Sequence, residues 1–200
     1  DNEKFDWGES QTDTEKYLEL ILDQPADFKP DSQYAYSNTN YLLIGDILDK
    51  VLGYPHQLYI EKEILAPLRL SQTYLTLSDA NIENLVSGYH HPYEQSFKEV
   101  DYIMPGGSMV ATAKDVAVFL RALIDGSLLT ENEQQVYSSI YDYEHTGWVL
   151  GYQSIARYHK DLDAVVIQFV NSTGGDSEMV SPIVYNRIIK LVEKQTSLDQ

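Results

Sequence analysis

Tyr36, Ser37 and Asn38 form a polar turn in the stretch YAYSNTNYLL, directly before an apolar run. A turn that only joins two elements uses Gly, Pro, Asn or Ser, and it has no need of a tyrosine two residues from an amide. A phenol can accept or donate a proton, although it titrates near ~10 unless neighbouring positive charge lowers that value. These residue types raise the question of proton-transfer chemistry at the mouth of a helix.

Each of these residues also has an ordinary structural explanation. A lone tyrosine is more often a packed side chain with a bonded hydroxyl than a catalytic base, by roughly ten to one. Asn38 is a suitable helix N-cap, and Ser37 has no His or Lys beside it in sequence. His145, taken alone, is a half-exposed strand histidine. Only a pattern that extends over several segments of the sequence would favour catalytic roles for these residues over the structural explanations.

Composition limits the kind of protein that carries this turn. Acidic residues outnumber basic ones by 31 to 14, and the formal net charge is -17. Such a charge argues against a nucleic-acid partner, because binding to a phosphate backbone requires a basic surface. The 200 residues are 43% hydrophobic, enough for a full-sized core, and contain no cysteine for a disulfide or a thiolate metal site.

The first half of the sequence has mainly helical patterns. Apolar spacing predicts a helix over residues 12–22, with Thr12 or Asp13 as its cap. A second pattern begins near Tyr41 with Asn38 or Thr39 as cap, and it ends at Gly53, which suits a left-handed C-cap. A third helix is expected over residues 55–65, before a proline. Residues 68–102 are tyrosine-rich and favour loops with short strands.

The second half predicts one more helix and then strands. Residues 112–126 form an amphipathic helix between Thr112 and Gly126. From Gln135 onward β-formers dominate, which predicts two or three antiparallel strands, and residues 179–194 return to helical spacing. The strand 164–171 is apolar on both faces, so we expect it to be central in its sheet. The chain is therefore expected to be α+β.

Three segments in this order resemble the serine beta-lactamase and penicillin-binding-protein family. They are the Tyr36-Ser37-Asn38 turn with its helix, PGGSMVATAKDVAVFLRALIDG, and HTGWVLGYQSIARYHKDLDAVVIQFVN. The nearest branch contains class C beta-lactamases, D-alanyl-D-alanine carboxypeptidases and esterases. One such motif is weak, whereas three in order, each with its neighbouring element, are fairly specific. The resemblance implies a partial beta-lactamase/transpeptidase-like fold, with a helical lobe beside an antiparallel sheet and its packed C-terminal helix.

The resemblance implies roles for the Tyr36-Ser37-Asn38 turn and for the segment that begins at His145. Tyr36 matches the tyrosine of a Tyr-x-Asn motif, which accepts and donates protons beside the nucleophile. Asn38 matches the amide that binds the substrate's amide group.

His145, Thr146 and Gly147 match a Lys-Thr-Gly triplet that several branches write as His-Thr-Gly. On an edge strand, His145 would face the site, Thr146 would bond a substrate carboxylate and Gly147 would leave room for the substrate. The N–H of Trp148 would form half of an oxyanion hole.

The Ser-x-x-Lys motif, which carries the family's nucleophile, does not occur in this sequence. The residues three positions before the ten lysines are Asp1, Asp13, Ala26, Ile47, Tyr59, Gln95, Ala111, Arg157, Arg187 and Leu191. The chain is accordingly expected to be a fragment, a processed piece or a relative that has lost its nucleophile. The short stretch between Gly126 and His145 further suggests an altered rim of the site.

Two functions remain open from the sequence. One is part of a serine hydrolase that acts on D-alanyl peptides, beta-lactams or related esters, with Ser-x-x-Lys supplied by an N-terminal segment or a second chain. The alternative is a non-catalytic binding or regulatory module that retains a groove for peptidoglycan-like ligands. The helical lobe is expected over residues 1–135 and the sheet lobe over residues 136–200. No cofactor and no metal are expected, since the histidines lack ligand spacing. The family implies export to the bacterial surface.

Overall fold

The computed structural model describes residues 8–10, 13–19, 22 and 25–198. Its helices are α1 (Thr14–Glu19), α2 (Asn38–Leu52), α3 (His56–Ile60), α4 (Ala113–Ile124), α5 (Glu131–Ile140) and α6 (Ser177–Leu198). Its strands are β1 (Thr73–Tyr74), β2 (Tyr89–His90), β3 (Val110–Ala111), β4 (Glu144–Val149), β5 (Tyr152–His159), β6 (Ala164–Val170) and β7 (Ser172–Thr173). The predicted α+β class is confirmed.

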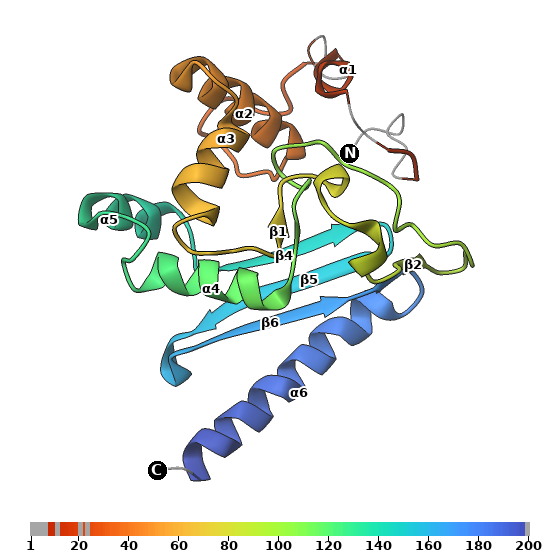
Figure 1. Cartoon of the computed structure of the whole chain (residues 1–200), viewed down its shortest axis with the longest axis vertical. Coiled ribbons are helices and arrows are strands. Elements are labelled where there is room, and N and C mark those ends of the chain that lie inside the picture. The colour runs from red at the N-terminus through yellow and green to blue at the C-terminus, as the bar shows by residue number, and fades with distance from the viewer. Residues whose placement is uncertain (1–7, 11–12, 20–21, 23–24, 199–200) are drawn as a thin grey trace.

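An antiparallel sheet of order β4-β5-β6 has α4 on one face and α6 on the other (Figure 1). The α6 face is built on Ile155, Tyr185 and Ile189, which pack together with Leu162 and Val166. On the opposite face, Arg121 of α4 reaches the ring of Tyr158 and the carboxylate of Asp163. The predicted antiparallel strands and the packing of the C-terminal helix are confirmed.

Most of the expected helices are present with shifted boundaries. Asp13 caps α1 by accepting the N–H of Lys16, while Thr12 lies outside the described residues. Ser37, not Asn38 or Thr39, is the N-cap of α2, and Gly53 ends the helix at φ 75° as predicted. Thr112 caps α4 by accepting the N–H of Asp115. After Ile60 the third helix widens into a π-helical turn over residues 61–65.

Helix α5 corrects the expectation that strands begin at Gln135. Thr130 and Glu133 form a reciprocal capping box, in which each side chain bonds the other residue's backbone N–H. This box begins a helix that continues to Ile140, despite the β-forming Val136 and Tyr137. The stretch between Gly126 and His145 is therefore occupied by a helix. The proposed division at residues 135 and 136, which falls inside α5, stays a prediction.

The position of β6 is a second correction. This strand is at the edge of the sheet among the described residues, although both of its faces are largely apolar. Its pairs with β5 run from Ala164 opposite His159 to Val170 opposite Gln153. The sequence pattern reports where the side chains can be buried and does not report whether a further strand is present. None of the helices in the described part of the chain is both long and apolar enough for a membrane span.

Hydrogen exchange tests the edge position of β6. The ladder with β5 leaves the amides of Val165, Ile167 and Phe169 directed outward, so we expect them to exchange roughly tenfold or more faster than those of Val166 and Gln168. Exchange can be followed by two-dimensional NMR of the chain in D₂O. Equal protection of the two sets would show that the outer edge is paired in solution.

Candidate active site at the Tyr-x-Asn turn and strand β4

Tyr36 and Asn38 lie at the beginning of α2 and contact each other. Ser37 is extended at φ -144° and ψ 127°, and Asn38 is the first helical residue. The Tyr36 hydroxyl donates to Oδ1 of Asn38 at 3.3 Å, and the Tyr36 ring is 6.2 Å from that of Tyr41. Tyr36 is 56% exposed, so its hydroxyl is accessible to a ligand. The turn thus presents a phenol and an amide together, as the sequence predicted.

Two close contacts hold α2 in place beneath this turn. A Cβ at Gly45 would lie 2.6 Å from Cγ of Pro105, and a Cβ at Gly106 would lie 3.0 Å from Cβ of Tyr41. The loop before β3 therefore packs directly on α2. At the other end of the helix, Asp49 accepts the backbone N–H of His56 at 2.6 Å and contacts its ring nitrogen Nδ1 at 2.7 Å.

Strand β4 carries the predicted His145-Thr146-Gly147 triplet. Among the described residues, this strand lies at an edge of its sheet. A two-residue turn, Leu150 and Gly151, closes the hairpin with Val149 opposite Tyr152. Tyr158 N–H donates to the carbonyl of Tyr143 at 3.0 Å, which continues the same ladder beyond the strand. In this alternation the backbone N–H groups of residues 144, 146 and 148 point away from β5 and toward the outer edge. A ligand with extended backbone could add to this edge.

The side chains of β4 divide between the two faces. Thr146 pairs with Ile155, whose side chain is in the α6 core, so Thr146 and Trp148 lie on the α6 face. His145 and Gly147 lie on the opposite face, and a Cβ at Gly147 would meet the Ser154 hydroxyl at 2.5 Å. The structure thus separates the side chains of His145 and Thr146, which sequence reasoning had placed on one site.

Trp148 is fixed on the α6 face by Glu178. The indole Nε1–H donates to Oε1 of Glu178 at 3.1 Å, and the N–H of Gly174 donates to the same oxygen at 2.7 Å. These hydrogen bonds, with that of Gly174 the largest, lower the pKa of Glu178 to about 2. The carboxylate thereby joins β4 to the beginning of α6.

Tyr141 is the functional candidate that sequence reasoning missed. Its ring is stacked on the imidazole of His145, with centroids 6.2 Å apart and planes inclined by 7°. Burial raises the pKa of Tyr141, and the phenols of Tyr41, Tyr137, Tyr36 and Tyr34 raise it further. Tyr141 is thus in ring contact with His145 and within electrostatic range of the Tyr36 turn. Its position four residues before His145, in a tyrosine-rich stretch, was the only available signal.

None of the described groups that shift the pKa of the Tyr36 phenol is a cation that would make it a base. Burial raises its pKa above the ordinary value, and the phenols of Tyr41 and Tyr34 raise it further. This shift is opposite to the one that proton abstraction near neutral pH requires. Among the described residues, the groups that shift Tyr36 are thus all unfavourable to its ionised form.

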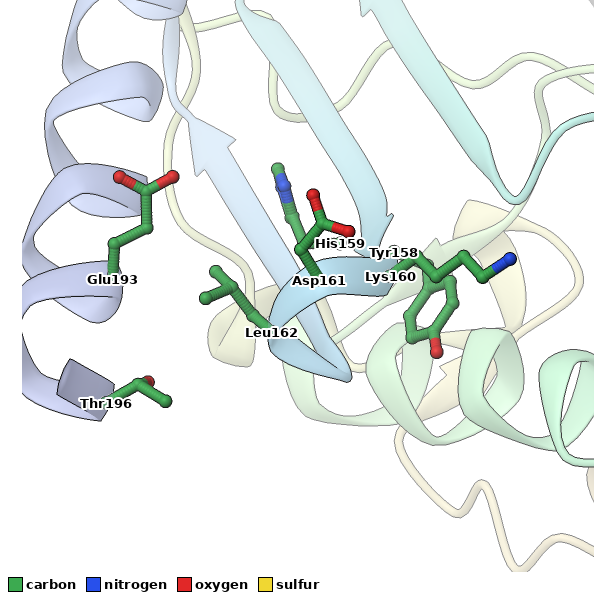
Figure 2. Close-up of a pocket in the computed structure, with 7 residues that line it drawn as sticks. All are labelled: Tyr158, His159, Lys160, Asp161, Leu162, Glu193 and Thr196. Atoms are coloured by element: carbon green, nitrogen blue, oxygen red, sulfur yellow. The ribbon is translucent and has the colours of Figure 1, made fainter. Parts of the chain in front are cut away.

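A hollow in the described surface lies away from these residues. It measures about 460 Å³ and lies between the β5–β6 turn and the end of α6 (Figure 2). Its lining residues, all labelled there, are Tyr158, His159, Lys160, Asp161, Leu162, Glu193 and Thr196. None of the predicted site residues contributes to it. No cluster of His, Asp and Glu suited to a metal occurs among the described residues.

Comparison with protein families and sequences identifies relatives. Residues 1–141 match the family model described as Beta-lactamase. Over 56 residues, 28% of this chain, it is 39% identical to a protein of Escherichia coli (strain K12) whose provisional name is D-alanyl-D-alanine carboxypeptidase. An alignment 136 positions long, which covers 56% of this chain, is 24% identical to the N-acetylmuramyl-L-alanine amidase of Bacillus subtilis (strain 168). These stretches span only 13% and 31% of the two relatives' own lengths.

Solved structures share the fold. A D-amino acid amidase from Ochrobactrum anthropi SV3, complexed with L-phenylalanine, superposes with a TM-score of 0.80 at 20% identity, over 98% of this chain and 70% of that one. A penicillin-binding protein from Bacillus halodurans superposes with a TM-score of 0.69 at 18% identity, over 86% of this chain and 61% of that one. At these identities the likeness establishes the architecture, including the sheet that carries β4.

Substitution of Gly45 tests the support of the Tyr36 turn. We expect Gly45→Ala to lower the free energy of unfolding by about 1–2 kcal/mol, because overpacking against Pro105 outweighs the gain in helix propensity. Gly107→Ala is the matched control, since its added Cβ meets nothing within 4 Å. Urea unfolding of both variants measures the effect. A Gly45→Ala variant as stable as the parent would show that this contact relaxes freely.

The lowered pKa of Glu178 leads to a separate prediction about how stability depends on pH. Because its pKa is lowered on folding, its contribution is present above about pH 4.5 and is lost as pH falls toward about 2. We expect Glu178→Gln to destabilise the protein at pH 7 by less than about 1.5 kcal/mol, since solvent screens this exposed group. The difference from the parent should shrink below pH 4.5. Glu99→Gln controls for the general loss of negative charge, and a pH-independent difference would contradict the assignment.

Proposed function

The chain belongs to the beta-lactamase family, and from this premise we propose that it forms one half of a serine acyl-transfer site. The substrate class is D-alanyl peptides, beta-lactams or related esters. The main support for the proposal is Tyr141, whose ring is stacked on the imidazole of His145 and which lies within electrostatic range of Tyr36. The names of the relatives, a carboxypeptidase and an amidase, support the same substrate class, since both types of enzyme cleave an acyl–nitrogen bond.

Each residue has a specific part in the proposed reaction. A serine hydroxyl attacks the substrate carbonyl and gives up its proton, and Tyr36 passes that proton to the leaving group. Asn38 binds the amide of the substrate. His145 provides its polar imidazole on the face of the sheet opposite α6. The backbone N–H of Trp148, directed to the outer edge of β4, donates to the oxyanion of the tetrahedral intermediate. Water then releases the acyl group.

The serine and its lysine are proposed to come from a complementing segment, either elsewhere in a longer polypeptide or in a second chain. The apolar surface that α2 leaves exposed supports this, because such surface is usually covered by another element. Apolar side chains of α2 such as Ile47 and Val51 are 57% and 78% exposed. A lysine from this segment would also supply the cation that Tyr36 lacks.

A non-catalytic binding module is the second candidate. It is favoured by one observation, the absence of Ser-x-x-Lys from the 200 residues. In this case the edge of β4 and the Tyr36 turn retain a groove for peptidoglycan-like ligands without forming an acyl-enzyme. Neither candidate involves nucleic acid, given the net charge of -17. Both include exposure at the bacterial cell surface, where such ligands occur.

Ligand binding and acylation can be measured separately on this chain. We expect D-alanyl-D-alanine to shift the NMR amide signals of Asn38 and of residues 145–148 together. Asn38→Ala should weaken binding about fivefold, the effect of one net hydrogen bond, while Asn84→Ala at an exposed position elsewhere should not. Incubation with a penicillin, followed by intact-mass measurement, should give no covalent adduct with the chain alone.

The possible results separate the candidates. Absence of any shift in both segments would contradict a shared ligand site and therefore both functions. A stoichiometric penicillin adduct that is lost in Ser37→Ala would show that the chain contains its own nucleophile. Acylation that arises only after a Ser-x-x-Lys segment is supplied would favour the catalytic candidate, and ligand binding without acylation in that complemented protein would favour the binding module.

A further inference from the structure

Tyr141 is held rigidly at the junction between α5 and β4. It is the first residue after α5, and its N–H donates to the carbonyl of Tyr137 at 3.0 Å. Its ring lies 5.8 Å from the ring of Tyr137, which in turn lies 5.6 Å from that of Tyr143. The backbone and side chain of Tyr141 are thus both fixed by α5, and 39% of the residue remains exposed.

The ring of Tyr141 is a close aromatic neighbour of the exposed imidazole of His145. The rings of Tyr141 and His145 are almost parallel, at 7°, with a centroid distance of 6.2 Å. A histidine on an edge strand would otherwise rotate about its side-chain bonds, at an entropic cost when a ligand orders it. Stacking against a fixed ring removes part of that freedom before the ligand binds.

The phenol of Tyr141 is also within electrostatic range of the Tyr36 turn. Tyr141 is within electrostatic range of Tyr36, Tyr34 and Tyr41, which belong to the Tyr36 turn and to α2. Tyr141 is therefore stacked on the imidazole of His145 and lies within electrostatic range of the Tyr36 phenol.

We propose that Tyr141 is a positioning residue, which fixes the plane of the His145 imidazole opposite the Tyr36 turn so that one ligand contacts both. This inference rests on the proposed function and adds a residue to it. Tyr141 acts through its ring face, on which His145 is stacked, and its hydroxyl is not required for that action. Phenylalanine should therefore replace it, whereas leucine, of similar bulk but without a flat ring, should not.

The test compares Tyr141→Phe, Tyr141→Leu and a Tyr59→Leu control, all in the full chain. Tyr59 is an exposed tyrosine of α3, outside the site. The ring protons of His145 should move downfield in Tyr141→Leu, because the shielding by the stacked ring is lost, and should stay in place in Tyr141→Phe. Affinity for D-alanyl-D-alanine should fall about threefold to tenfold in Tyr141→Leu and change less than about twofold in the other two.

A double-mutant cycle with His145→Ala determines the route of the effect. If Tyr141 acts through His145, Tyr141→Leu should cause no further loss of affinity in the His145→Ala background. A full additional loss there, or unchanged His145 ring signals in Tyr141→Leu, would overturn the positioning role alone. Failure of the parent chain to bind the dipeptide would overturn the proposed function and this role with it.

Discussion

The buried hydroxyl of Thr173 determines how strand β4 is presented. Thr173 is completely buried, its Oγ1 accepts the N–H of Gly151 at 2.8 Å, and it contacts Nδ1 of His90 at the same distance. Gly151 is in the hairpin turn at φ 86°, and a Cβ there would lie 2.8 Å from the backbone of Gly88. The turn is therefore pinned at both of its sides. A slip of one residue would exchange the faces of His145 and Thr146 and reverse the direction of every outward amide.

The fixed register leaves the site with an electrostatic deficit. The edge of β4 offers backbone donors, and the Tyr36 turn offers an amide and a phenol, yet the phenol is surrounded by other phenols that disfavour its ionisation. A net charge of -17 on the whole chain acts in the same direction. In the proposed site the backbone donors and the amide come from the described residues, whereas none of the groups that shift the pKa of Tyr36 there is a cation that would activate the phenol. The register of β4 is set by local hydrogen bonds, whereas the pKa of Tyr36 is set by the groups that pack against its turn. Different parts of the sequence therefore control the geometry and the charge of the site.

The sequence predicts those features that depend on local pattern. Gly53 ends α2 as expected because only its own backbone conformation matters, and the β5–β6 hairpin follows from alternation and a polar turn. Helix α5 was missed because Val136, Tyr137 and Ile140 favour strands by type, while the Thr130–Glu133 capping box decides the outcome. The contact of Tyr141 with His145 could not be derived, since it depends on the angle at which α5 meets β4. The edge position of β6 was likewise beyond a pattern that records only side-chain burial.

Two exposed surfaces of the described residues support the single complementing segment that we propose. Val165, Ile167 and Phe169 direct their amides outward from an edge strand whose two faces are apolar, an arrangement that exposed edges normally avoid. On the other side of the molecule, the apolar stripe of α2 is exposed directly below the turn whose phenol lacks a cation. A second copy of this chain would bring another -17 charges to these surfaces and would leave Tyr36 without a lysine. If the complementing segment that we propose added a strand to β6 and a lysine-bearing helix near α2, it would satisfy the backbone, the apolar surface and the charge together, which is why we propose complementation rather than self-association.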